Sequence, residues 1–181
     1  MMNKNIVSLF LTMLVYNLNC KAQKNFDSVR HYNNAIYFEL GGPTFIYSLG
    51  YERTWYHNNW FSAISSAGFS YVPDGVSMGY VEPGVLLRNK NLALELGVAL
   101  MSYTERPSNG AQFATSDGSG SAKMLTISPR IGARFFTKNQ RFHFRTGITP
   151  SLEIWNNDPS GWPKDNPIFI WLNVFTIGYR F

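Results

Sequence analysis

The stretch that decides the fold runs from Ile168 to Phe181 and reads IFIWLNVFTIGYRF. Its second half alternates between large apolar side chains and smaller or polar ones. The apolar face holds Phe175, Ile177, Tyr179 and Phe181, and the other face holds Thr176, Gly178 and Arg180. A period of two predicts a β-strand with one face in an apolar environment. Because an exposed apolar strand invites edge-to-edge pairing, we expect a neighbouring strand on each of its edges.

Seven further segments alternate in a similar way. The eight predicted strands are 35–41, 45–56, 60–72, 80–88, 92–103, 124–136, 141–155 and 168–181. Aromatic residues make up 16% of the chain and charged residues 15%, whereas a typical soluble domain carries ~25% charged residues. Strands that alternate between a lipid-facing surface and a polar interior explain this composition. We therefore predict an all-β fold, an eight-stranded antiparallel up-and-down transmembrane β-barrel over residues 35–181.

The predicted connections alternate in length. They are short at 57–59, 89–91 and 137–140 and longer at 73–79, 104–123 and 156–166, with the tight GGPT turn at 41–44 as the exception. Bacterial membrane barrels have short periplasmic turns and long extracellular loops, so the lengths predict an orientation. In this orientation two aromatic girdles are expected. The periplasmic girdle would contain Trp55, Tyr56, Trp60, Phe135, Phe142, Tyr179 and Phe181, and the outer one Tyr71, Tyr103, Trp155 and Phe169.

The first 22 residues are expected to form a removable secretory signal peptide. They have a basic start, an apolar run too short for a membrane helix of ~20 residues, and a small-x-small site ending at Ala22. Lipid attachment at Cys20 is the alternative, although Asn19 is an unfavourable residue before a lipidated cysteine. Cleavage after Ala22 would remove the only cysteine, and with it any disulfide or thiolate chemistry. Residues 23–34 would then form a polar periplasmic lead-in.

A final Phe181 with an aromatic residue two positions earlier, Tyr179, resembles the C-terminal assembly signal of Gram-negative outer-membrane β-barrels. The resemblance implies a small barrel of the OmpA/OmpX type in the cell outer membrane. Its partners would be outer-membrane lipids and the barrel-assembly machinery. Loss of Lys4 and Lys21 with the signal peptide would lower the formal charge from +5 to +3, which is too small and too dispersed to favour nucleic acid as a partner. The alternative fold is a soluble lipocalin-like barrel or sandwich that buries the apolar face.

Strand alternation assigns a set of charged side chains to the barrel interior. They are Glu39, Glu52, Glu82, Glu95, Glu153, Arg88, Arg130, Arg134, His143, Arg145 and Arg180. Side chains alone fill the interior of an eight-stranded barrel, so these groups are expected to form salt bridges and not to line a pore. We predict no catalytic residue, no cofactor and no metal site. A proton relay or an acid–base pair in the lumen is the weaker alternative.

Three prolines interrupt predicted strands at outward positions, and each removes a backbone donor from the sheet. They are Pro83, Pro129 and Pro150. If the sixth and seventh strands pair symmetrically about their turn, Pro129 and Pro150 become neighbours. A lateral gap there would partly resemble the one in the outer-membrane palmitoyl transferase. Residues 168–174 add apolar side chains to the predicted lumen face. We expect these side chains to fill the core and the prolines to mark bulges, and the alternative is that the upper lumen holds a lipid or small hydrophobe.

The expected function is non-catalytic, either structural or in surface interaction, with any extracellular partner meeting the three longer connections. A barrel that binds lipid or a small hydrophobe is the first alternative. A lipid-modifying enzyme is less expected, because such barrels keep a His with a Ser near the outer leaflet. In this chain His31 lies in the lead-in, His57 in a periplasmic turn and His143 near the periplasmic start of a strand.

Overall fold

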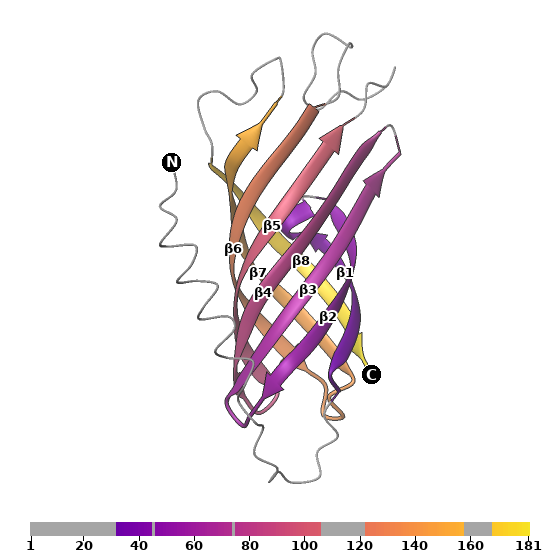
Figure 1. Cartoon of the computed structure of the whole chain (residues 1–181). Coiled ribbons are helices and arrows are strands. Elements are labelled where there is room, and N and C mark those ends of the chain that lie inside the picture. Colours follow the sequence, from indigo (N-terminus) through magenta and orange to yellow (C-terminus); the bar gives the residue numbers. More distant parts are fainter. Residues whose placement is uncertain (1–31, 45, 74, 106–121, 158–167) are drawn as a thin grey trace.

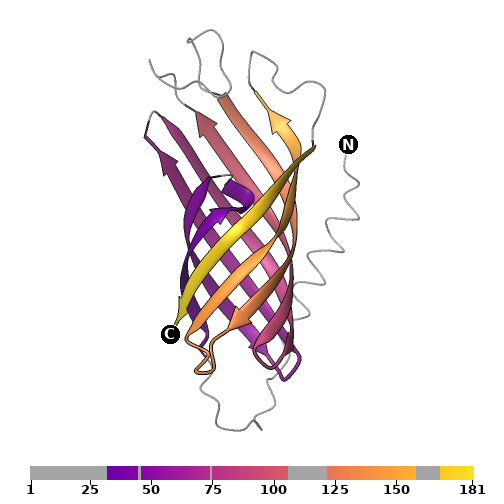
Figure 2. The same cartoon turned by 180° about the vertical axis from the view of Figure 1, so that it is seen from behind.

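The described residues of the computed structural model form a closed antiparallel β-barrel, which confirms the predicted all-β fold and strand number (Figures 1 and 2). The structure describes residues 32–44, 46–73, 75–105, 122–157 and 168–181, with only the backbone described for 122 and 168–174. The strands are β1 (Asn34–Gly41), β2 (Tyr47–His57), β3 (Phe61–Val72), β4 (Val76–Asn89), β5 (Leu92–Glu105), β6 (Ala122–Phe136), β7 (Phe142–Asn156) and β8 (Ile168–Arg180). The predicted signal peptide lies outside the described residues, as does most of the predicted lead-in.

Each strand pairs with its neighbours in sequence, and β1 pairs with β8 to close the barrel. At this seam Ala35 lies opposite Arg180 and Ile36 opposite Tyr179. Beyond the last strand residue, the backbone N–H of Phe181 donates to the carbonyl of Asn34 at 2.9 Å, and the N–H of Asn34 donates back at 3.2 Å. The first and last strands therefore share one continuous ladder.

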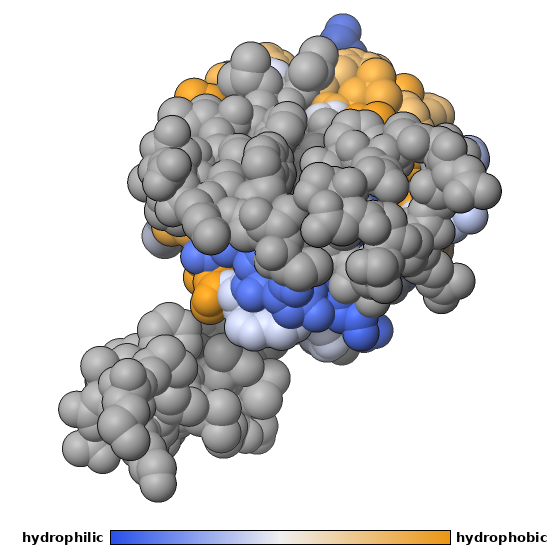
Figure 3. Space-filling model, turned by 90° about the horizontal axis from the view of Figure 1, so that it is seen from above, coloured by the Kyte–Doolittle hydropathy of each residue, from blue (hydrophilic) through white to orange (hydrophobic). Residues whose placement is uncertain are grey.

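The faces of β8 follow the predicted alternation. Phe175, Ile177 and Tyr179 are exposed on the outside, whereas Thr176 and Arg180 are buried inside. The other strands repeat this arrangement, so large apolar side chains cover the outer wall. Seen from one end, hydrophobic surface is visible on the outside of the barrel (Figure 3). The described residues include no helix long and apolar enough to cross a membrane.

Three short connections lie at the same end of the barrel, which we call the turn end. They join β2 to β3, β4 to β5 and β6 to β7, and they match the predicted short turns. Lys90 and Gln140 adopt positive φ angles of 55° and 58° in two of them. The outward aromatic residues near this end are exposed, as predicted for one girdle. They are Trp55, Tyr56, Trp60, Phe135, Phe142, Tyr179 and Phe181.

The opposite end differs from the prediction at three places. Residues 76–79, expected in a loop, belong to β4, and Val72 pairs with Val76. The apolar and polar faces of the strand are exchanged here, because the apolar Val76 and Met78 point inward and the small, polar Ser77 points outward. Tyr103, expected at the outer girdle, also points inward and is 8% exposed. Tyr71 and Trp155 are exposed as expected, whereas the side chain of Phe169 is outside the described set.

The connection between β1 and β2 is the third difference. A tight hairpin turn is expected at 41–44, but Gly42–Thr44 forms a 3-10 helix, η2, with all three residues buried. Figure 1 shows η2 inside the barrel wall. Gly41 and Gly42 have φ angles of 75° and 79°, which glycine adopts without steric cost, so the chain can turn inward at this point.

Candidate functional site

The barrel interior holds a column of buried ion pairs. Three arginines from β6 and β7 form it, and each contacts two carboxylates from other strands. Arg130 contacts Glu39 (2.8 Å) and Glu82 (3.0 Å), Arg134 contacts Glu52 (2.6 Å) and Glu95 (2.9 Å), and Arg145 contacts Glu39 (3.2 Å) and Glu95 (2.9 Å). Since Glu39 and Glu95 are each shared, the six contacts form one connected network.

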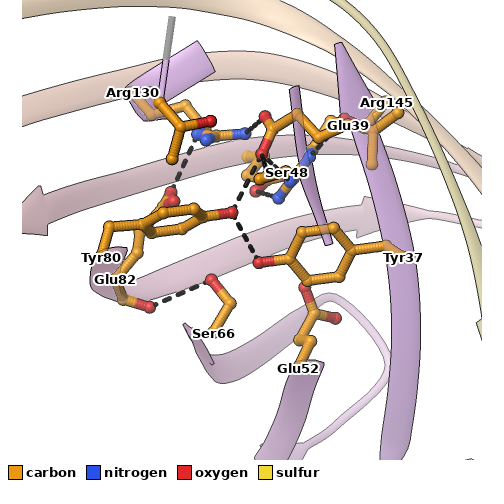
Figure 4. A network of polar contacts seen from close by, with 12 residues as sticks. Tyr37, Glu39, Ser48, Glu52, Ser66, Tyr80, Glu82, Arg130 and Arg145 are labelled. Carbon is orange, nitrogen blue, oxygen red and sulfur yellow. Dashed lines mark hydrogen bonds and ion pairs between the residues drawn. The ribbon is translucent and has the colours of Figure 1, made fainter. Parts of the chain in front are cut away.

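The network extends into a cluster of hydroxyl groups around Glu39 (Figure 4). The Tyr80 hydroxyl donates to Glu39 at 2.9 Å and shares a 2.7 Å hydrogen bond with the Tyr37 hydroxyl. Ser48 also donates to Glu39, at 3.4 Å. The guanidinium carbon of Arg145 lies 4.9 Å from the centre of the Tyr37 ring. Charge-assisted hydrogen bonds of this kind offset the free-energy cost of burying the ions.

Four of the predicted interior residues stand apart from this network. Arg88 and Arg180 lie near the turn end and form no ion pair with a carboxylate among the described residues. His143 is fully buried, with no hydrogen-bond partner in the described part of the chain for either ring nitrogen. Glu153 lies at the opposite end, near a bulge in the β6–β7 pair. Alternation therefore identifies these inward positions but not their partners.

Apolar layers lie on both sides of the ion network. Towards the turn end, one layer contains Ile64, Leu86, Ala93 and Phe136. Towards the opposite end, a larger layer is rich in Met and Tyr and contains Tyr37, Val76, Met78, Tyr80, Ala99, Met101, Tyr103 and Met124. Both layers are buried, and the ions between them are 0–3% exposed in their side chains. The described interior thus has buried apolar side chains on both sides of the ions, together with buried hydroxyl groups such as those of Ser128, Thr149 and Ser151.

Interior rings fit this narrow barrel because glycines lie beneath them on the neighbouring strands. Tyr37 lies beside Gly50, its cross-strand partner, and His143 beside Gly178 in the same way. A Cβ placed on Gly50 would lie 2.2 Å from Cζ of Tyr37, and one on Gly178 would lie 2.1 Å from Cε1 of His143. These positions need glycine for the close approach of the ring.

The three strand prolines, Pro83, Pro129 and Pro150, lie at interruptions of the sheet, as the sequence predicts. Pro129 lies in register with Pro150, but the β6–β7 ladder stops at Ile127 and resumes at Ile131. The β4–β5 ladder is similarly interrupted between Val81 and Gly84, at Pro83. On the inner side of the β6–β7 interruption, the hydroxyls of Ser128 and Ser151 share a 2.7 Å hydrogen bond and are fully buried. Polar hydroxyls therefore line the wall behind Pro129 and Pro150.

A histidine and a serine whose contact is not predicted from the sequence lie side by side at the turn end. Nδ1 of His57 lies 2.7 Å from Oγ of Ser62. A guanidinium nitrogen of Arg88 lies 3.4 Å from the same Nδ1. Ser62 is only 1% exposed, so a substrate has little access to its hydroxyl group. This pair is thus poorly placed to act as a general base and nucleophile.

The described residues contain no cluster of three or more His, Cys, Asp or Glu side chains that could hold a metal ion. Glu39, Glu52 and Glu95 each face an arginine instead. In comparisons with known proteins, no protein-family model and no curated protein matches the chain.

Proposed function

We propose that the chain is an outer-membrane β-barrel of a Gram-negative bacterium that serves as a non-catalytic scaffold with no open pore. The arrangement of its two faces carries the proposal. Leu49, Phe69 and Ile131 are 64%, 56% and 60% exposed on the outer wall, whereas Arg130, Arg134 and Arg145 are buried inside. A water-soluble barrel would gain stability from the reverse arrangement, because apolar area removed from water contributes ~25 cal/mol per Å². A lipid environment suits the observed arrangement, in which apolar side chains face outward and charged ones inward.

Heat modification in gel electrophoresis tests the barrel and its compartment. The outer-membrane fraction is loaded in detergent with and without boiling. The folded barrel should migrate as a compact band that shifts on boiling, because a closed sheet has no free edge for detergent-induced unfolding to start from. Recovery of the chain in the soluble fraction after an alkaline wash of the membranes would contradict the proposal.

Conductance in planar bilayers tests the closed interior. The purified chain should give no stable channel steps, because the ion network lies between two buried apolar layers. A matched variant, Phe136→Ala, removes the largest side chain of the layer at the turn end. If the wild type already conducts ions in discrete steps, the scaffold proposal without a pore is wrong.

Any surface interaction would be made by the connections at the end opposite the turns. This end is extracellular in the predicted orientation. Residues 106–121 lie outside the described set and form the longest connection between two strands, from β5 to β6. Replacing them with a short Gly-Ser turn leaves both strands intact. Binding to host or matrix surfaces should fall while the heat-modified gel shift remains. Unchanged binding would assign the interaction to another part of the chain.

Binding of a lipid or small hydrophobe is a second candidate function, favoured by two observations. The β6–β7 ladder is interrupted at Pro129 and Pro150, and Met78, Met101 and Met124 belong to an apolar layer inside the barrel. Methionine side chains adapt to ligands of different shape. The predicted contribution of residues 168–174 to an apolar lumen concerns side chains outside the described set.

A reversible cross-link tests whether a ligand enters between β6 and β7. Ser128→Cys and Ser151→Cys, made together in the chain without residues 1–22, place two thiols at a position where the hydroxyls are 2.7 Å apart. Oxidation should lower uptake of a fluorescent fatty acid, and reduction should restore it. The serine parent under the same oxidant is the control. Uptake that is insensitive to the cross-link would exclude this entry route.

A further inference from the structure

Two arginines at the turn end differ from every arginine of the ion network. Arg130, Arg134 and Arg145 each contact two carboxylates. Arg88 and Arg180 contact none among the described residues, although Arg180 is only 7% exposed. Burial of a cation without a counter-charge is unfavourable, so the position is suited to an anion.

The contacts of these two guanidiniums hold them in place without neutralising them. Arg88 donates to the side-chain oxygen of Gln140 at 2.5 Å and lies 3.4 Å from Nδ1 of His57. Arg180 donates to the backbone carbonyl of Tyr32 at 2.7 Å. The partners in Gln140 and Tyr32 are neutral oxygen acceptors, and the third is a histidine ring nitrogen. The two side chains are therefore oriented, and no carboxylate among the described residues forms an ion pair with either guanidinium.

One aromatic ring brings the two charges together. The guanidinium carbons of Arg88 and Arg180 lie 4.3 Å and 5.2 Å from the centre of the Phe136 ring. Phe136 belongs to the apolar layer that closes the interior at this end. Cation–π contacts attract each guanidinium to the ring, but they do not remove the repulsion between two like charges. An anion that contacts both guanidiniums would remove it.

The surrounding turns add positive charge and no negative charge. Lys90, Lys138 and Arg141 are exposed at this end. The turn segments 57–61, 88–92 and 136–142 contain no Asp or Glu. Basic groups around a recessed pair of arginines raise the local concentration of anions.

From these contacts we infer that Arg88 and Arg180 form an oxyanion-binding site at the turn end of the barrel, which takes a phosphate group. Guanidinium groups bind phosphate through paired N–H donors, and a tetrahedral oxyanion can accept from two arginines at once. The phosphate could belong to a free small molecule or to a phospholipid headgroup. The site depends on the barrel geometry and not on the scaffold role proposed above.

Titration with inorganic phosphate in a neutral detergent tests the site. Binding is followed by calorimetry, with chloride as the competing anion at constant ionic strength. The double variant Arg88→Gln, Arg180→Gln should lower the affinity for phosphate at least tenfold. Lys138→Gln, which removes an exposed charge at the same end, should change it by less than twofold. An equal loss in both variants would overturn the inference, because it would show that general charge and not a site binds phosphate.

Lipid vesicles test whether the bound phosphate belongs to a phospholipid headgroup. The wild type and the double variant are incorporated into phosphatidylcholine with and without phosphatidylglycerol, and lipid selectivity is measured. If inorganic phosphate does not bind, a preference for phosphatidylglycerol that the double variant loses assigns the site to headgroup phosphate. If neither probe distinguishes the double variant from the wild type, the inference is wrong. The gel shift on boiling, measured on each preparation, ensures that only folded protein is compared.

Discussion

Arg134 on β6 and Glu52 on β2 meet inside the barrel through two parallel hydrogen bonds, Nη1 to Oε1 at 2.6 Å and Nη2 to Oε2 at 2.8 Å. These strands lie on opposite sides of the closed sheet, four positions apart in the strand order. Arg134 also reaches Glu95 on β5. A single side chain thus ties together walls that share no backbone ladder, which makes it a sensitive point for stability.

Arg134→Met should destabilise the barrel by about 3–5 kcal/mol, because it leaves the carboxylates of Glu52 and Glu95 buried without their shared partner. Urea unfolding in detergent micelles, followed by the loss of the compact gel band, measures this change. The variant Arg134→Met, Glu52→Gln should recover part of the loss, since it removes the charge of Glu52, whereas Glu95 still contacts Arg145. Strict additivity of the two substitutions would contradict a direct interaction.

Gly50→Ala should lower the free energy of unfolding by ~1–3 kcal/mol, because the added methyl group would overlap the Tyr37 ring and force it to move. Gly79→Ala is the matched control. Its added Cβ would have no atom nearer than the carbonyl oxygen of Gly68 at 3.8 Å. Thermal unfolding of both variants in the same detergent makes the comparison. Equal destabilisation would show that the ring does not depend on the glycine beside it.

Tyr80→Phe should cost more stability than Tyr37→Phe. The Tyr80 hydroxyl donates to Glu39 and also bonds to the Tyr37 hydroxyl, so its removal takes a donor from a buried carboxylate. Loss of such a bond costs about 1–3 kcal/mol. Tyr37→Phe leaves the contact between Tyr80 and Glu39 in place. Chemical denaturation of the two single variants gives the order, and the reverse order would place the stronger contact at Tyr37.

Backbone amides near Pro129 and Pro150 should exchange hydrogen faster than those in the middle of an uninterrupted ladder. Neither proline can donate, and three consecutive positions of the β6–β7 pair lack ladder contacts. Hydrogen exchange followed by mass spectrometry can compare peptides covering 127–131 and 148–152 with a peptide covering 92–96. The latter segment is paired with β6 at every position. Uniform protection across these peptides would show that the interruption does not weaken the wall.

Much of this architecture follows from alternation alone. Because successive side chains of a strand point to opposite faces, the sequence is enough to predict that Glu39, Arg130 and Arg145 face inward. The register of the β6–β7 hairpin follows from its short turn, which is why Pro129 and Pro150 were correctly expected as neighbours. These features depend on local geometry, so they need no knowledge of the whole barrel.

The partners of the inward charges could not be predicted in this way. Whether Arg134 meets Glu52 or another carboxylate depends on strand tilt and stagger around the closed barrel, which alternation does not determine. The loop expected at 73–79 was wrong for a related reason. Pro73, Gly75 and Gly79 suggest a loop. In the structure, however, the apolar side chains of Val76 and Met78 point inward. Because the prediction assigned apolar side chains to the outer face, this segment did not match the expected strand pattern.

The seam between β1 and β8 has a consequence for how the chain acquires its structure. Because the two ends of the sheet pair with each other, the wall is complete only after all eight strands are present. At this seam Phe38 of β1 pairs with Ile177 of β8, although the two residues lie far apart in the sequence. Contacts so distant in sequence form slowly, and the unpaired edges that precede them are prone to aggregation. Closure of the seam is therefore expected to limit the folding rate, and holding the chain unfolded until that step would favour its yield.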